Sequence, residues 1–259
     1  MNTSSIIFLS IIQGLTEFLP ISSSGHLVII ESFFMTSKPD ATLEVFLHTG
    51  TLFAVLLYYR EAIAEIFMDL VNLRFKSNGG RLGLFLLLAT IPATVVGMMF
   101  RATLESIFQN AYFAAAMLII TSLILFSTHL IKRNINFKWN FVNSFIIGFA
   151  QVFAMLPGIS RSGITIVAAL WLGASGEDAT EFSFLLAVPA IIGVTVIKIF
   201  EVVSGTSNFY SVYSIGIIIS AIVGYVSLTV LVPIVRSGKL WIFGIYCLLI
   251  GILSIIFAK

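Results

Sequence analysis

Residues 13–25 read QGLTEFLPISSSG, and residues 151–163 read QVFAMLPGISRSG. Aligned without gaps, the two stretches share five identities in thirteen positions: the Gln, the Ile, and the Ser-X-Ser-Gly of each loop. Each stretch also carries a proline, Pro20 or Pro157, which stops an incoming helix because it lacks an N–H and clashes with the preceding turn. The paired stretches predict a duplicated chain in which two interrupted helices supply equivalent polar loops.

The composition places this chain in a lipid bilayer. Its 259 residues are 59% hydrophobic and only 10% charged, with a mean hydropathy of +1.08. A soluble domain carries about 25% charged residues. The net charge of +2 gives no basis for nucleic-acid binding, and the single Cys247 provides neither a disulfide framework nor a cysteine metal site. We therefore expect one integral membrane domain over residues 1–259.

Six apolar stretches are long enough to cross a hydrocarbon core of ~30 Å, which needs ~20 residues. They are 43–59, 82–100, 111–131, 183–203, 212–235 and 241–258. Two further regions, 5–35 and 140–173, are interrupted midway, which leaves arms too short to cross and predicts re-entrant hairpins. The expected fold class is an all-α polytopic membrane protein with a first repeat over 1–131 and a second over 138–259. Each repeat has one re-entrant hairpin and three transmembrane helices.

Three spans per half is an odd number, so the second half should be inverted relative to the first. Nine of the fourteen Lys and Arg residues lie in loops 60–81, 132–139 and 236–240, all on one predicted side. The positive-inside rule makes that side the cytoplasm, so the first hairpin enters from outside and the second from inside. Inverted repeats with broken helices place their site where the two repeats meet.

The first hairpin contains a carboxylate at membrane depth. Gln13 and Glu17 are four residues apart and share a helical face. A loop and one turn follow, which hold Ser22, Ser23, Ser24, Gly25 and His26. A buried carboxylate in lipid is costly and is functional by default. In the alternative reading, Glu17 caps the loop by accepting hydrogen bonds from its serines.

The three histidines differ in how strongly their sequence positions indicate a role in the site. His26 follows Ser-Gly at the start of a helix, where a histidine can take a proton or attack phosphorus. A lone histidine is often structural, but the neighbouring serines and carboxylate favour a catalytic His26. His48, inside span 43–59, is a weaker candidate to support the site. We expect His129, near a helix end, only to face water.

The second hairpin supplies a positively charged side chain. Arg161 lies between Ser160 and Ser162, on a loop that leads into a helix beginning near Gly163. A helix N-terminus binds phosphate through its free N–H groups and partial positive charge, and arginine adds a planar fork for two phosphate oxygens. Alternatively, Arg161 pairs with Glu17 in a buried salt bridge, and both readings hold if substrate competes for the arginine. Together these groups indicate phosphoryl chemistry on a lipid.

The two motifs carry a resemblance to a known family. Residues 13–26 resemble the (Glu/Gln)-X-X-X-Glu and Ser-rich segment of the undecaprenyl-pyrophosphate phosphatases, the bacitracin-resistance protein family. Residues 156–163 are similar to that family's Pro-Gly-X-Ser-Arg-Ser-Gly motif. The resemblance covers the whole chain in length and span pattern. Gln13 stands at the first acidic position, a variant that the motif admits, and this leaves Glu17 as the main acidic group.

The resemblance implies hydrolysis of undecaprenyl pyrophosphate to undecaprenyl phosphate and inorganic phosphate, which recycles the lipid carrier of cell-wall precursors. It implies a divalent cation, Mg²⁺ or Ca²⁺, with Glu17 as its ligand or as a proton-transfer group. Ser23 or His26 would be the nucleophile or base, and Arg161 would bind the diphosphate. We expect His26 to activate Ser23 or a water. The other expected substrate-binding residues are Gln13, Ser22, Ser24, Gly25, Ser160, Ser162 and Gly163.

The same resemblance implies an inner-membrane protein whose site faces the periplasm or cell exterior, in agreement with the charge count. The rival class is a transporter or flippase of a polyprenyl phosphate, because opposed hairpins around a midplane polar site also suit alternating access. Such a carrier would hold the phosphate without breaking it. The sequence leaves open whether the chain forms a homo-oligomer.

Overall fold

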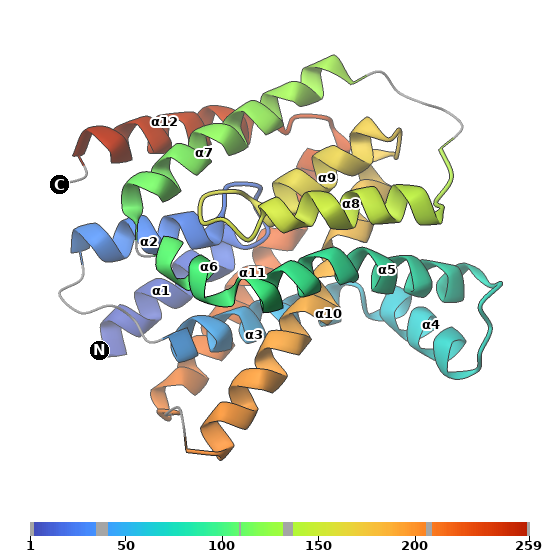
Figure 1. Cartoon of the computed structure of the whole chain (residues 1–259), viewed down its shortest axis with the longest axis horizontal. Coiled ribbons are helices and arrows are strands. Elements are labelled where there is room, and N and C mark those ends of the chain that lie inside the picture. The colour runs from blue at the N-terminus through green and yellow to red at the C-terminus, as the bar shows by residue number, and fades with distance from the viewer. Residues whose placement is uncertain (1–2, 35–40, 109, 132–136, 206–208, 258–259) are drawn as a thin grey trace.

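A computed structural model describes residues 3–34, 41–108, 110–131, 137–205 and 209–257. Within these ranges the chain forms twelve α-helices and one 3₁₀ turn and contains no strand, which confirms the all-α prediction (Figure 1). The elements are α1 (Thr3–Thr16), α2 (Ser23–Phe34), α3 (Ala41–Tyr58), α4 (Arg60–Val71), α5 (Asn78–Met99), α6 (Arg101–Ile107), α7 (Ala111–Phe126), η1 (Ser127–Leu130), α8 (Phe141–Phe153), α9 (Arg161–Trp171), α10 (Gly176–Val203), α11 (Val212–Arg236) and α12 (Trp241–Phe257).

Four of the described helices are long and apolar enough to cross a membrane: α5, α7 with its η1 extension, α10 and α11. α3 and α4 together make a fifth candidate span if the two helices are counted as one. The bend between them is 86°. The 17 residues of α12 extend about 25 Å at 1.5 Å per residue. The chain is therefore a multi-pass membrane protein.

The prediction that residues 60–81 form a loop was wrong, because α4 occupies the first half of that stretch. Its apolar Ile63 and Ile66 pack against the core, while Glu61 and Glu65 each precede one of them in sequence. These charges lower the local hydropathy and hide the amphipathic pattern from a search for transmembrane stretches.

Two pairs of short helices occupy the regions predicted as interrupted. The first pair is α1 and α2, of 14 and 12 residues, and the second is α8 and α9, of 13 and 11 residues. At 1.5 Å per residue each helix is about 16–21 Å long, too short to cross ~30 Å of hydrocarbon. The breaks lie at residues 17–22 and 154–160, as the prolines and glycines predicted. The opposite insertion of the two pairs stays a prediction.

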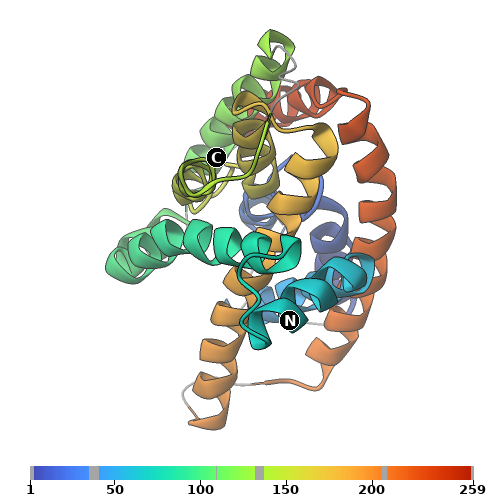
Figure 2. The same cartoon turned by 90° about the vertical axis from the view of Figure 1, so that its right-hand side faces the viewer.

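Some of the helix contacts recur between the two halves. α1 packs along α11 and α8 packs along α5, while α7 pairs with α12 and α3 with α10. Figure 2 shows the same helices from a second side, with α11 and α10 crossing the long dimension of the view. A two-fold relation between the halves would produce this set of contacts, although the repeat boundaries at 131 and 138 stay a prediction from sequence.

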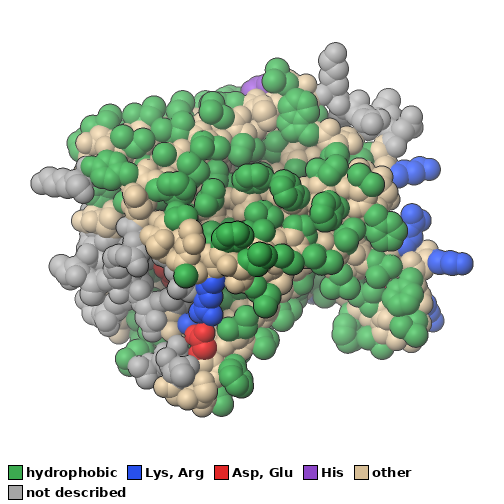
Figure 3. Space-filling view, in the orientation of Figure 1, with side chains coloured by type: hydrophobic (Ala, Val, Ile, Leu, Met, Phe, Trp, Pro, Cys, Tyr) green, Lys and Arg blue, Asp and Glu red, His purple; other side chains and the backbone are tan. Residues whose placement is uncertain are grey.

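The outer surface is suited to lipid. Figure 3 shows one face covered by hydrophobic side chains, with Lys and Arg gathered at the edge beside the α4–α5 connection. That connection contains Arg74 and Lys76. Soluble proteins rarely expose an apolar surface as continuous as this hydrophobic face. Other basic residues counted in the orientation argument, Lys38, Lys132, Arg133 and Lys259, lie outside the described ranges.

Candidate active site

The breaks of both short helix pairs meet at Glu17, whose side chain is only 6% exposed. Arg161 Nη2 donates to Glu17 Oε1 across the two hairpins. Gln13 Nε2 donates to Glu17 Oε2 over 3.0 Å, and Ser23 Oγ donates to the same oxygen over 2.6 Å. The predicted Gln13–Glu17 face and the predicted Arg161–Glu17 pair are both confirmed. Three of the expected site residues, Gln13, Ser23 and Arg161, therefore converge on the carboxylate of a fourth, Glu17.

The sequence repeat explains how this convergence arises. Ser23 and Arg161 are equivalent positions of the two hairpins, each the first residue of the helix after the break. The residue equivalent to Glu17 is Met155, which cannot accept a hydrogen bond of comparable strength. Gln151, the counterpart of Gln13, is also buried, and in both glutamines Oε1 has no hydrogen-bond partner among the described residues. The repeat supplies two similar pairs of short helices, and only the first pair contains the carboxylate at its break.

Serine caps begin the second helix of each pair in the same way. Gly25 N donates to Ser22 Oγ over 3.2 Å, and Gly163 N donates to Ser160 Oγ over 3.1 Å. In both loops the hydroxyl two residues further on, of Ser24 or Ser162, lies 3.3 Å from the capping hydroxyl. Capping satisfies N–H groups that the helix leaves free. A role for these serines in substrate binding stays a prediction.

The two loops are in direct contact. Ser162 Oγ donates to Leu19 O over 3.5 Å, and a Cβ added at Gly25 would lie 2.8 Å from Gly158 Cα. Gly25 therefore allows the two backbones to approach closely. Thr121, on α7, holds the second loop: its Oγ1 donates to Gly158 O over 2.7 Å and accepts from Ser160 N over 3.1 Å. Nothing in the local sequence around Thr121 indicates this role.

His26 lies beside the site but its hydrogen bonds point elsewhere. Nδ1 is 2.8 Å from Ser22 O, and since a carbonyl only accepts, Nδ1 carries the hydrogen. Nε2 lies 2.9 Å from the Tyr246 hydroxyl on α12, with which it forms a hydrogen bond, and the two rings stack. The expected pairing of His26 with Ser23 is absent from the described hydrogen bonds, in which Ser23 donates to Glu17. A catalytic role for His26 stays a prediction.

His26 also stabilises an unusual backbone conformation at Ser22. Ser22 has φ +66°, in the left-handed region that residues other than glycine seldom adopt. The hydrogen bond from His26 to the Ser22 carbonyl fixes the peptide that links Ser22 to Ser23. The geometry thus makes His26 and Tyr246 supports for the loop that presents the Ser23 hydroxyl.

His48 is the residue that sequence reasoning undervalued. It lies on α3, and its Nε2 is 3.4 Å from Glu17 Oε2. Its Nδ1 is 2.8 Å from Glu44 O. The available signal was a histidine within an apolar span, beside Thr49-Gly50-Thr51. Because 31 positions separate Glu17 from His48, helical spacing could not bring them together. His129, by contrast, lies against the Trp241 ring away from this cluster.

The donor set does not fit a divalent cation held by the protein alone. No group of three or more His, Cys, Asp or Glu side chains is arranged for a metal within the described part of the chain. Both oxygens of Glu17 already accept hydrogen bonds, one of them from a guanidinium that occupies the place of a cation. Mg²⁺ and Ca²⁺ prefer several oxygen ligands. Metal binding by Glu17 therefore stays a prediction from the resemblance.

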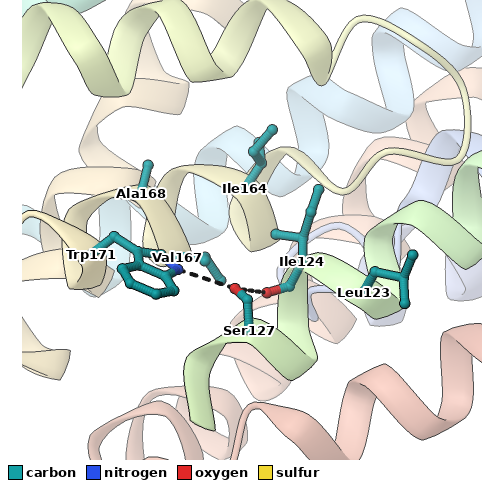
Figure 4. A pocket seen from close by; sticks show the side chains of 7 residues that line it. All are labelled: Leu123, Ile124, Ser127, Ile164, Val167, Ala168 and Trp171. Carbon is teal, nitrogen blue, oxygen red and sulfur yellow. Dashed lines mark hydrogen bonds between the residues drawn. The ribbon is translucent and has the colours of Figure 1, made fainter. Parts of the chain in front are cut away.

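A groove between α7 and α9 is a separate feature (Figure 4). It is a shallow, open groove of about 430 Å³, lined by Leu123, Ile124, Ser127, Ile164, Val167, Ala168 and Trp171. The Trp171 indole N–H donates to Ser127 Oγ over 3.1 Å. No charged side chain lines this groove, so it does not supply groups for phosphate chemistry.

The bundle of apolar helices and the buried carboxylate, hydroxyl and guanidinium define a multi-pass membrane protein with a site suited to phosphate. A family model described as bacitracin resistance protein BacA matches residues 6–253. The chain belongs to this family.

Relatives over the full length carry one name, undecaprenyl-diphosphatase. A protein of Christiangramia forsetii is 40% identical over 266 residues, and one of Halothermothrix orenii is 38% identical over 262 residues. Each alignment covers 100% of this chain and 99% of the relative. A protein of Desulfatibacillum aliphaticivorans is 36% identical, with 97% of both chains covered.

Proposed function

We propose that this chain is an undecaprenyl-diphosphatase, which hydrolyses undecaprenyl pyrophosphate to undecaprenyl phosphate and inorganic phosphate. The family and the names of the full-length relatives support this function. The observation that carries it is the convergence of Ser23 and Arg161 on Glu17 at the junction of the hairpins. A hydroxyl, a base and a phosphate-binding fork are the groups that phosphoryl transfer needs.

In the proposed reaction, Ser23 Oγ attacks the terminal phosphorus while Glu17 takes the serine proton. The bond between that phosphorus and the bridging oxygen breaks, and Glu17 passes the proton to the departing undecaprenyl phosphate. Water then attacks the phosphoserine with Glu17 as base, inorganic phosphate leaves, and the proton returns to Ser23 Oγ. Arg161 and the N–H groups at the start of α9 hold phosphate oxygens during both steps.

The location follows the same proposal. Hydrolysis of the carrier lipid takes place in the inner membrane, at a site open to the periplasm or cell exterior through the first hairpin. The positive charge of the α4–α5 connection, on the predicted cytoplasmic side, supports this orientation.

Purified protein in detergent, supplied with undecaprenyl pyrophosphate, is expected to release one inorganic phosphate per substrate. Phosphate is measured colorimetrically and the lipid product by mass spectrometry. The same assay with EDTA tests the predicted need for Mg²⁺ or Ca²⁺, which should appear as lost activity that either ion restores. Tight binding of the lipid without phosphate release would instead identify a carrier and contradict the proposed hydrolysis.

A further inference from the structure

His48 brings a third element, α3, to the Glu17 carboxylate. Its Nδ1 carries a hydrogen because it faces the Glu44 carbonyl oxygen, 2.8 Å away, which only accepts. Its Nε2 faces Glu17 Oε2 at 3.4 Å, and an ionised carboxylate also only accepts. The contact is therefore attractive when Nε2 also carries a hydrogen, which makes the ring an imidazolium. The His48 side chain is 30% exposed, so its charge keeps part of its hydration.

The two cations contact different oxygens of the carboxylate. Arg161 donates to Glu17 Oε1, whereas His48 lies beside Oε2, which also accepts from Gln13 and Ser23. Arg161 can therefore leave without disturbing the groups on Oε2. A buried carboxylate that loses its only cation is strongly disfavoured, and this cost would keep the arginine on Glu17.

We propose that His48 is a positioning residue that acts as the second counter-ion of Glu17 and so frees Arg161 to bind the diphosphate. The inference rests on the proposed function, since the diphosphate is the anion to which Arg161 turns. His48 acts through Glu17 and does not itself contact the substrate. With His48 in place, Glu17 stays ionised and ready to accept the Ser23 proton after Arg161 has moved.

A double-mutant cycle tests this inference through binding rather than turnover. The probe is a prenyl methylenediphosphonate, whose P–C–P bridge resists hydrolysis, and its Kd is measured by calorimetry in detergent. His48→Gln keeps an N–H donor near Glu17 but removes the charge. It should weaken binding about tenfold, a coupling of ordinary size. In a Glu17→Gln background the same change should leave Kd within about twofold, because a neutral residue 17 does not retain Arg161.

Controls separate this role from a structural one. Glu17→Met, which copies Met155 of the second hairpin, provides a second background in which residue 17 is neutral. Thermal unfolding checks that every variant is folded. His129→Gln should leave Kd unchanged. Equal weakening by His48→Gln in both backgrounds, or weakening in neither, would overturn the inference. Failure of the wild-type protein to bind the probe would count against the proposed function itself.

Discussion

Glu17→Gln is expected to lower the rate of phosphate release by about 10²- to 10⁴-fold, the usual loss on removing a general base. The amide has nearly the same volume as the carboxylate and its oxygen can still accept from Gln13 and Ser23. It cannot, however, take the Ser23 proton. The loss should therefore fall on kcat, measured as phosphate release at saturating undecaprenyl pyrophosphate.

Glu61→Gln is the matched control for this prediction. Glu61 lies on α4 with 90% of its side chain exposed, far in sequence from either loop. Its removal changes the net charge by the same amount and should leave kcat unaltered. If Glu17→Gln kept more than about a tenth of the wild-type kcat, with the fold intact, Glu17 would not be the base.

Of the substitutions considered, Gly158→Ala is expected to destabilise the folded protein most. Gly158 has φ +98°, and a Cβ there would collide with the Ala114 carbonyl oxygen and lie 2.7 Å from Met117 Cβ. Overpacking costs about 1–3 kcal/mol and a disfavoured φ about as much again. The variant should unfold at a clearly lower temperature in detergent. It should also lose phosphate release, because the same loop carries Arg161.

Gly193→Ala provides the comparison. Gly193 lies inside α10, where nothing is within 4 Å of an added Cβ and the backbone is helical. Alanine is preferred over glycine in a helix by roughly 0.5–1 kcal/mol, so this variant should match or slightly exceed the wild-type midpoint. Equal midpoints for Gly158→Ala and the wild type would show that the loop yields to the added methyl group.

The parts of the site that sequence predicted are those that follow from local spacing or from the repeat. Gln13 and Glu17 share a face because they are one helical turn apart. Arg161 reaches Glu17 because both stand at the breaks of repeated hairpins that are expected to meet. The breaks contain Pro20 and Pro157, each of which lacks an N–H and clashes with the preceding turn. Proline alone does not mark a break, since Pro92, Pro189 and Pro233 lie inside continuous helices; the neighbouring Ser and Gly residues of the repeated loops complete the signal.

Other parts of the site depend on packing between distant helices. His48 and Thr121 lie within apolar spans, and only the fold brings one to Glu17 and the other to the second loop. Tyr246 is 220 positions away in sequence from its partner His26. This partner occupies Nε2 of His26, and Ser23 donates to Glu17 rather than to the expected histidine. Such contacts leave no pattern in a single sequence.

In the proposed reaction Ser23, with Glu17 as its base, receives the phosphoryl group. Rapid acid quenching during turnover of undecaprenyl pyrophosphate labelled in its terminal phosphate tests it directly. An acid-stable phosphoserine at residue 23 is expected, identified by peptide mass spectrometry. Acid-labile label on His26, detected by a parallel quench in base, or the absence of any covalent phosphate in either quench, would contradict it.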